Sequence, residues 1–300
     1  MAKQYISANC YCRRVFGQKV YKLALSAATS CPNRDRTVAY GGCTFCSAGG
    51  SGDFAAPAGQ DIASQLAEAK RILGSKGEGL KYIAYFQSFT GTHGDLRRLE
   101  EIYTRAIAEP DIVGLSIATR PDCLGEAAMA MLTRLSGKTV LWVELGLQTM
   151  HDETARRINR GYELKEYERA IEKLRKINVH IITHLILGLP GESEEDMLES
   201  VEYAGGLTDG VKLQLLHVLK NTELEKSYAA GEFETLSMEQ YCELAAKAVL
   251  RLPGNVVIHR LTGDGNKREL IAPKWSADKK RVLNQLNRAF AKYGITQIRE

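Results

Sequence analysis

The sequence predicts an α/β protein built as one barrel-like domain, in which βα units repeat around a parallel sheet. Two observations lead to this prediction. Apolar, β-branched runs alternate with amphipathic stretches of helical length along the 300 residues. No low-complexity linker and no repeat of about 20–50 residues divides the chain, and α/β barrels of this length occur as single domains.

The apolar runs place the strands of the predicted sheet in order along the chain. We expect strands at residues 20–27, 82–86, 112–118, 140–147, 179–187, 211–217 and 256–259. The amphipathic stretches predict helices at residues 61–73, 95–108, 126–135, 164–177, 193–204 and 237–251, with a last helix at 277–293. Pro-Gly pairs at residues 190–191 and 253–254 separate these elements. The predicted division is an N-terminal extension (1–19), the barrel (20–260) and a basic C-terminal extension packed on it (261–300).

The composition is that of a globular protein, with 44% hydrophobic and 25% charged residues. No apolar run approaches the roughly 20 residues of a membrane span, and the N-terminus MAKQYISANCYCRRVFG lacks the apolar core of a signal peptide. We therefore expect a cytoplasmic protein with no membrane partner. The net charge of +4 is concentrated near the C-terminus, where residues 251–300 hold eleven Lys/Arg and four Asp/Glu. Such an excess is compatible with a nucleic-acid partner.

Seven cysteines, an odd number, indicate metal or redox chemistry more than a disulfide framework, because a reducing cytosol keeps thiols free. Three of them, Cys31, Cys43 and Cys46, lie in the loop after the first predicted strand. In a parallel barrel such loops carry the chemistry. Three thiolates from one loop can hold a [4Fe–4S] cluster and leave one iron open. The alternative is a zinc site completed by Cys10, Cys12 or a histidine in a non-catalytic interaction protein, or simply buried thiols.

The loop from Cys31 to Cys46 resembles that of the radical S-adenosylmethionine (SAM) superfamily, in the YhcC/YtqA-like branch related to the Elongator catalytic subunit and oxygen-independent coproporphyrinogen oxidases. The landmarks of that branch occur along the chain in the expected order, from the loop itself onward: CPNRD, GGCTFCSAGGSGDFA, ATRPDCL, ELGLQT with INRGY, LILGLPGE and HRLTGD. The resemblance implies a partial (β/α)6 barrel of the TIM type with short terminal additions. It also implies that SAM chelates the open iron and is cleaved to a 5′-deoxyadenosyl radical. Phe45 matches the family's aromatic position near the adenine.

Polar residues at other strand ends are candidate SAM contacts. Gln87 and Ser88 stand where many family members carry Gly-Gly-Glu, so one of them would have to accept from the SAM amino group; an ordinary polar strand end is the alternative. Alternation puts Glu144 and Gln148 on one face of the strand at 140–147, expected to be the interior. The resemblance makes SAM the partner of Glu144, and a structural ion pair with a barrel Lys or Arg is the alternative.

Three further loops carry candidate residues. Arg120 could face the cofactor or substrate, or merely fix its loop through Asp122. Cys123 could donate a hydrogen atom beside a radical, or be a small buried hydrophobe. Gly188 resembles the glycine element near the adenine, although it could equally shape the turn.

On the sixth predicted strand of the barrel, Lys212 is a candidate catalytic residue and Gln214 a candidate SAM contact, both favoured over His217. His184, inside an apolar strand, is expected to be a core histidine.

The resemblance suggests tRNA as the substrate, with the carboxymethylaminomethyl group at C5 of the wobble uridine converted to aminomethyl. An electron donor such as flavodoxin or ferredoxin is implied. A phosphate-binding strip could form beside the barrel mouth, or the same residues could be a solvated helix face: Lys267, Arg268, Lys274, Lys279, Lys280 and Arg281, with Trp275 able to stack on a base. A small-molecule substrate of the porphyrin-pathway kind is the alternative.

Overall fold

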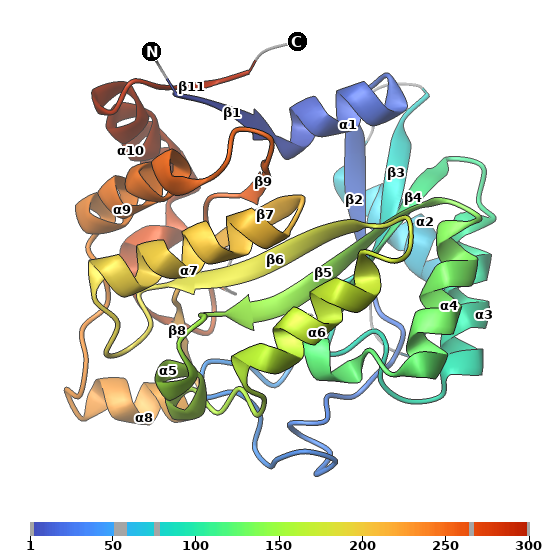
Figure 1. Ribbon diagram of the computed structural model, residues 1–300, viewed down its shortest axis with the longest axis horizontal. Helices are drawn as coiled ribbons and strands as arrows, with labels where there is room; N and C mark the ends of the chain where they lie inside the picture. Colours follow the sequence, from blue (N-terminus) through green and yellow to red (C-terminus); the bar gives the residue numbers. More distant parts are fainter. Residues whose placement is uncertain (1–2, 51–58, 75–78, 264–266, 299–300) are drawn as a thin grey trace.

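The computed structural model describes residues 3–50, 59–74, 79–263 and 267–298. A curved sheet of nine strands runs through the molecule in the order β11-β1-β9-β7-β6-β5-β4-β3-β2, and every pairing in it is parallel (Figure 1). Six neighbouring strands follow chain order, as a barrel of βα units requires: β2 (Val20–Leu25), β3 (Lys81–Phe86), β4 (Ile112–Thr119), β5 (Val140–Gln148), β6 (His180–Leu187) and β7 (Gly210–Leu215). The α/β class and the parallel barrel of the sequence prediction are confirmed.

The predicted helices cover the outside of this sheet. They are α2 (Ile62–Leu73), α3 (Leu96–Ile107), α4 (Glu126–Ser136), α6 (Leu164–Leu174), α7 (Glu194–Leu207) and α9 (Met238–Arg251). Side chains at Asp61, Asp95, Ser193 and Ser237 accept hydrogen bonds from the first-turn amides of their helices, which typically stabilises a helix by about 1 kcal/mol. Their apolar faces pack on the strands in one continuous core.

Both ends of the chain join the same sheet, which the sequence analysis did not predict. β1 (Lys3–Ser7) lies between β9 (Val257–Arg260) and β11 (Ile295–Gln297), and β1 and β11 run side by side at the top of Figure 1. α1 (Ala8–Phe16) follows β1 directly in the chain, and α10 (Lys279–Lys292) directly precedes β11. Ser7 caps α1 and Gly17, at φ 71°, ends it, so the sequence held signals for this helix. The predicted boundaries at residues 19/20 and 260/261 stay predictions.

Short elements gather at the carboxyl ends of the strands. The predicted strand at 211–217 is interrupted: β7 ends at Leu215, and β8 (Val218–Leu219) leaves the sheet to pair with β10 (Leu270–Ala272). Amide hydrogen bonds from Leu224 to Thr44 and from Lys220 to Glu269 tie this segment to the cysteine loop on one side and to the basic C-terminal region on the other. The remaining short elements are η1 (Pro121–Cys123), α5 (Asp152–Arg157), α8 (Glu223–Ala229) and η2 (Lys274–Ala277).

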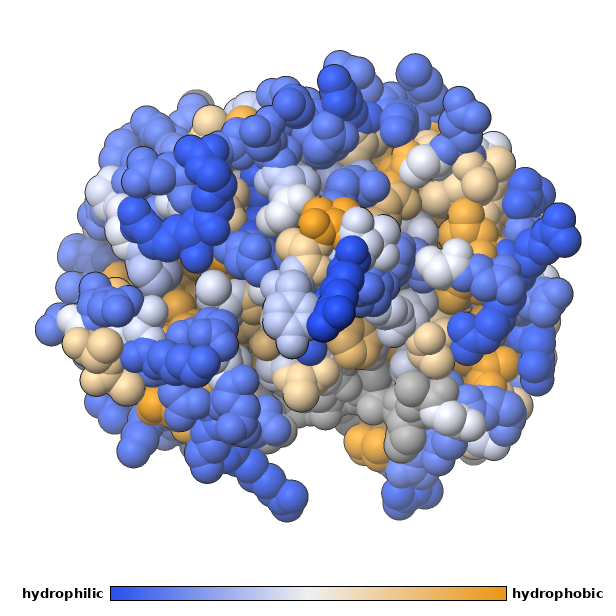
Figure 2. Space-filling model, turned by 90° about the horizontal axis from the view of Figure 1, so that it is seen from below, coloured by the Kyte–Doolittle hydropathy of each residue, from blue (hydrophilic) through white to orange (hydrophobic). Residues whose placement is uncertain are grey.

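The interior of the barrel is layered. Its amino-terminal end is filled by an apolar cluster of Cys12, Ile83, Trp142 and Ile182, against which Tyr11 of α1 packs. The opposite, carboxyl end carries the cysteine loop. Figure 2 views the molecule from the side on which this loop lies in Figure 1: hydrophilic side chains cover most of that face, and hydrophobic ones appear as separate patches. Between the two ends lies a layer of polar side chains.

Candidate active site

The three cysteines of the loop after β2 line one cavity at the carboxyl end of the barrel. The loop is wound tightly around them. The amides of Arg34 and Asp35 both donate to the Cys31 carbonyl, at 2.7 and 3.0 Å, and the Cys46 amide donates to the Cys43 carbonyl at 3.0 Å. Gly42 has φ 83°, and a Cβ there would lie 2.9 Å from the Arg34 side chain. The loop therefore needs glycine at this point to bring Cys43 and Cys46 back towards Cys31.

Arg34 fastens the two ends of the loop together. Its guanidinium donates to the carbonyls of Cys46, Ser47 and Ala48, and its aliphatic part packs beneath Gly42. An arginine can serve three carbonyls because its five N–H donors point outward in a fixed fork. Arg34 thus holds the segment Cys46 to Ala48 against the first half of the loop.

Two asparagines join the cysteine loop to the segment after α5. The buried Asn33 amide donates to the Asn159 carbonyl and lies 3.6 Å from the Cys43 sulfur. Asn159 in turn donates to the Gly42 carbonyl at 2.7 Å. A Cβ at Gly161 would lie 2.4 Å from Asn33 Oδ1, so this position also requires glycine. These contacts explain physically why the CPNRD and INRGY landmarks occur in one chain: they form two halves of one loop junction.

The arrangement of the sulfurs fits a cluster better than a single zinc ion. Ligands of one tetrahedral zinc lie about 3.8 Å apart, given a Zn–S distance of about 2.3 Å. Among the described residues, the ligand-type side chains whose atoms all lie within 4.8 Å of one another are His151, Asp196 and Glu199, and the three cysteines are not such a set. Wider spacing leaves room for a larger group between the sulfurs.

The Cys43 sulfur is buried close to the other two cysteines of the loop, so it carries a charge only when a metal is bound. Burial, followed by the neighbouring sulfurs, raises the pKa of the Cys43 thiol to about 12. Three thiolates in such a place need a cation between them. The other cysteines named for a zinc site, Cys10 and Cys12, lie buried on α1 at the opposite end of the barrel. The zinc site of the sequence analysis therefore does not form with either of them.

Glu144 is the centre of the polar layer inside the barrel. Its carboxylate accepts from one side chain of each other strand from β2 to β7: Lys22 (2.7 Å), Tyr85 (2.9 Å), Ser116 (2.7 Å), His184 (2.7 Å) and Lys212. We call these six residues the Glu144 network. Glu144 is 1% exposed and Lys212 3% exposed, so the centre of the network is shielded from solvent.

The network shows which protein partners Glu144 and His184 have inside the barrel. Burial opposes ionisation of Glu144, but Lys212 and Lys22 outweigh it, and together they hold the pKa of this carboxyl well below its usual range. Its partners are barrel residues, as in the ion-pair alternative, and both carboxylate oxygens are already engaged. The ion pairs with Lys22 and Lys212 are present, and the SAM contact of Glu144, which also lines the cysteine cavity, stays a prediction. His184 is a hydrogen-bonded core histidine, as expected.

Several other predicted residues do reach the cysteine cavity. Besides Glu144 and Lys212, its wall includes Phe45, Gln87, Arg120, Gln148 and Gln214. The Arg120 guanidinium binds Asp122 through two bonds of 2.9 and 2.7 Å and also donates to the Arg160 carbonyl. Arg120 thus both fixes its loop and forms part of the cavity wall, which unites the two predicted roles.

Three predicted residues do not line this cavity. Ser88 is buried beside it, where its carbonyl accepts from Thr29. Gly188 has φ 93°, and a Cβ there would lie 3.2 Å from Leu236, so the glycine shapes a turn against an apolar neighbour, and its contact with the adenine stays a prediction. Burial raises the pKa of the Cys123 thiol to about 12, which keeps it protonated, but the side chain lies away from the cavity beside Asp122.

The predicted basic strip is exposed except for its aromatic member. Lys267, Arg268, Lys274 and the first turn of α10 lie at the surface. Trp275 is half-buried: its indole N–H donates to the Leu236 carbonyl at 3.0 Å and its ring packs against Tyr241. The ring is thus packed against the core on one side, and its predicted stacking on a base stays a prediction.

The sequence analysis missed Lys22, Tyr85 and Ser116 as members of the site. Each stands on the inward face of its strand, two residues from another inward residue, so strand alternation held the signal. What alternation could not show is that all three converge on one carboxylate.

Comparison with known proteins identifies the family. The model of the radical SAM superfamily matches residues 31–204, and that of the radical SAM C-terminal domain matches residues 208–292. The chain belongs to the radical SAM superfamily. YtqA of Bacillus subtilis is 43% identical over 98% of this chain and 92% of its own length. YhcC of Escherichia coli is 36% identical over 94% and 91%, which supports the YhcC/YtqA-like branch.

More distant radical SAM relatives share only part of the chain or only the fold. A Methanocaldococcus jannaschii protein named tRNA uridine(34) acetyltransferase is 29% identical over 52% of this chain and 29% of its own length. The solved structure of an archaeal Elp3 from Methanocaldococcus infernus superimposes with a TM-score of 0.64 at 19% identity, covering 90% of this chain and 63% of that chain. The latter likeness confirms the fold of a radical SAM enzyme.

Membership of this family implies an iron–sulfur cluster and SAM as cofactors, and an enzymatic activity. In the described parts of the chain, no helix has the length and apolar character needed to cross a membrane.

Proposed function

We propose that this radical SAM enzyme acts on tRNA and converts the carboxymethylaminomethyl group at C5 of the wobble uridine to aminomethyl. The observation that carries the proposal is the half-chain likeness to a protein named for uridine 34 of tRNA, in a chain whose three cysteines line one cavity. The exposed basic residues of the C-terminal region support a nucleic-acid partner.

Within this proposal Cys31, Cys43 and Cys46 hold a [4Fe–4S] cluster. When bound, the cluster and SAM supply a 5′-deoxyadenosyl radical. Asn33 and Arg34 hold the three sulfurs in place, and Phe45, Gln87 and Gln148 are the side chains that would contact SAM. A low-potential electron donor, flavodoxin or ferredoxin, is the proposed reductant.

The tRNA substrate also finds support in the position of the basic residues. Lys267 and Arg268 flank Glu269, whose carbonyl accepts from the Lys220 amide, and the segment after Lys220 reaches the cysteine loop at Thr44. These bonds put the basic strip and the cysteine loop on the same end of the barrel. A tRNA bound on the strip could thus extend one unpaired nucleotide into the cavity.

The test is deletion of the gene, followed by mass spectrometry of tRNA nucleosides. We expect carboxymethylaminomethyl uridine to accumulate and its aminomethyl product to disappear. A plasmid copy of the wild-type gene should restore the product and Cys43→Ala should not, whereas Cys242→Ala, which alters a buried cysteine on α9, should restore it. Unchanged wobble uridines together with accumulation of a small metabolite would overturn the tRNA substrate and favour the small-molecule alternative.

The ligand assignment is tested separately on purified protein. After anaerobic reconstitution, iron and sulfide content should fall sharply in Cys31→Ala, Cys43→Ala and Cys46→Ala, and stay at the wild-type level in Cys242→Ala. The reduced wild-type protein should release 5′-deoxyadenosine from SAM. A full complement of iron in Cys43→Ala would contradict the assignment.

A further inference from the structure

Asn33 stands two residues after Cys31, and both its backbone and its side chain bind the part of the loop that carries Cys43. Its carbonyl accepts from the Gly42 amide at 2.8 Å. Its side-chain nitrogen lies 3.6 Å from the Cys43 sulfur, at the distance of an N–H···S hydrogen bond. Asn33 is 0% exposed, so this donor is shielded from solvent, and a hydrogen bond in such a place is electrostatically stronger than one in water. The contact is a direct, buried link between an amide and one of the three sulfurs.

The direction of the Asn33 side-chain amide is set by a second acceptor. A side-chain amide has two N–H donors, and the other one binds the Asn159 carbonyl. If the amide were turned over, its oxygen would face that carbonyl oxygen and the Cys43 sulfur, which are both electron-rich. Asn33 Oδ1 instead lies buried beside Gly161, with no hydrogen-bond partner among the described residues. The nitrogen, and not the oxygen, therefore points at Cys43.

The Asn159 carbonyl that orients Asn33 is itself held in place. Asn159 has φ 53°, and its side chain donates to the Gly42 carbonyl at 2.7 Å. On one side of it, the Ile158 carbonyl accepts from the Thr44 amide at 3.0 Å. On the other side, Arg160 is buried and donates to two carbonyls at the end of β5. The acceptor that directs the Asn33 amide is thus built into the junction between the two loop segments.

We propose that Asn33 raises the reduction potential of the cluster through its N–H···S hydrogen bond to Cys43. A ligating thiolate becomes more negative when the cluster takes up an electron, so a donor on its sulfur stabilises the reduced form more than the oxidised one. Asn33 thereby makes the cluster easier to reduce by a flavodoxin or a ferredoxin. It is a positioning residue that acts through Cys43 and does not line the cavity. The inference rests on the proposed assignment of Cys31, Cys43 and Cys46 as the cluster ligands.

Anaerobic redox titration of the reconstituted protein, followed by EPR of the reduced cluster, measures this potential. In Asn33→Leu, which keeps a branched side chain without a donor, the ratio of reduced to oxidised cluster at a fixed potential should fall about tenfold, or about 59 mV for one electron. Asn159→Gly is the matched control. It removes a side-chain bond from the same junction and tolerates the positive φ, but it keeps the Asn159 carbonyl and the Asn33 amide, so its potential should stay at the wild-type value.

A second measurement tests the contact without any substitution. Pulsed EPR of the reduced wild-type protein, labelled with ¹⁵N in its asparagine side chains, should show a nitrogen coupled to the cluster. Should Asn33→Leu not take up the cluster, Asn33→Ala replaces it in the titration, because it removes the same donor and adds no volume. The coupling should be absent from whichever of the two variants is titrated.

Iron and sulfide are measured on every sample, so that only fully loaded proteins are compared. An unchanged potential in a loaded Asn33 variant, an equal shift in Asn159→Gly, or no coupled nitrogen in the labelled wild type would overturn this inference alone. Failure of the wild type to bind iron and sulfide would overturn the ligand assignment, and this inference with it.

Discussion

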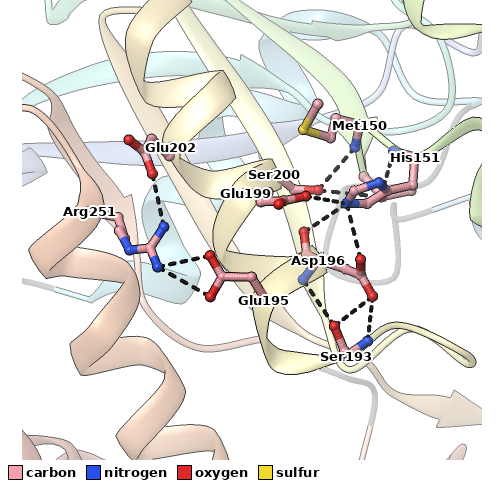
Figure 3. A network of polar contacts seen from close by, with 10 residues as sticks. Met150, His151, Ser193, Glu195, Asp196, Glu199, Ser200, Glu202 and Arg251 are labelled. Carbon is pink, nitrogen blue, oxygen red and sulfur yellow. Dashed lines mark hydrogen bonds and ion pairs between the residues drawn. The ribbon is translucent and has the colours of Figure 1, made fainter.

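Two charged networks of this protein use the same kinds of side chain in opposite surroundings. In the Glu144 network, one carboxylate receives five donors inside the barrel. In the second network, on the surface between α7 and α9, Arg251 joins Glu195 at 2.9 Å and Glu202 at 3.0 Å, and these partners are more than half exposed (Figure 3). Nearby, the Nε2 atom of His151 lies 2.9 Å from the Asp196 carbonyl and 3.8 Å from the Glu199 carboxylate, both on α7.

The two networks differ in whether water can take the place of a lost ion-pair partner. On the surface, a lost partner is exchanged for solvent, so each ion pair contributes little to stability. Inside the barrel, where Glu144 and Lys212 are almost fully buried, loss of one partner leaves an unpaired charge shielded from solvent. The geometry of the ion pairs is similar in both places, and burial sets the cost of breaking them.

The largest effect is expected for Glu144→Gln. Loss of the negative charge leaves the buried Lys212 without its counter-ion, which should lower the free energy of unfolding by about 3–5 kcal/mol. Urea unfolding measures the change. In the double variant Glu144→Gln/Lys212→Met the unpaired ammonium is gone as well, and we expect a loss clearly smaller than the sum of the single losses. Additive losses would show that the two residues do not depend on each other.

Arg160→Lys tests a buried cation held mainly by carbonyls. Its guanidinium is 1% exposed and donates to the carbonyls of Leu147, Thr149 and Tyr162. A lysine ammonium cannot reach all three carbonyls, so at least one of them loses its donor. We expect the free energy of unfolding to fall by about 1–3 kcal/mol. Arg156→Lys, a neighbouring exposed arginine, is the matched control. Equal stability of the two variants in urea would refute the expectation.

The pH dependence of stability should also follow burial. Burial, helped by Lys212, lowers the pKa of His184 to about 4, against 6.5 in the unfolded chain. Between pH 6.5 and 4 the unfolded chain therefore binds a proton that the folded one refuses, so stability falls as the pH falls, by up to about 1.4 kcal/mol per pH unit for this group. Burial lowers the pKa of His180 to about 4 in the same direction.

Urea unfolding between pH 7 and 4.5 measures this slope. His184→Gln should flatten it, since glutamine can still donate to Glu144 but does not titrate. His151→Gln removes a surface histidine and is the control. A slope unchanged by His184→Gln would mean that this histidine has the same pKa in the folded and the unfolded chain, which would contradict the expectation.

The smallest effect is expected for Arg251→Ala, which breaks both ion pairs of the surface network. Its stability should be hard to separate from that of wild type, and any difference should vanish in 1 M salt, where exposed charges are screened. A loss comparable to that of Glu144→Gln would remove the distinction between the two networks.

The sequence predicted the parts of the molecule that local patterns encode. Strands β2 to β7 were predictable because each is a buried apolar run, and the cysteine loop because three thiols in one loop limit the possible chemistry. The expectation that Lys212 and Gln214 face the cavity followed from alternation within one strand.

Contacts between distant segments could not be predicted in this way. The sequence suggests an interior Glu144, but not that Lys22, 122 positions away, takes one of its oxygens. The short strands β1 and β11 carry no pattern of their own and exist because each pairs with a strand from the other end of the chain. Trp275 stands in a basic segment, yet its ring packs against Tyr241 of a helix that begins 37 positions earlier.

The place of β1 in the sheet has a consequence for the order in which the protein can be assembled on the ribosome. The first strand to be synthesised pairs only with β9 and β11, which are made near the end. While β2 to β7 can pair with their neighbours as they emerge, residues 3–7 must wait for some 250 further residues of chain before their partners exist. Completion of the sheet is therefore a late event, in which the oldest part of the nascent chain is captured by the youngest.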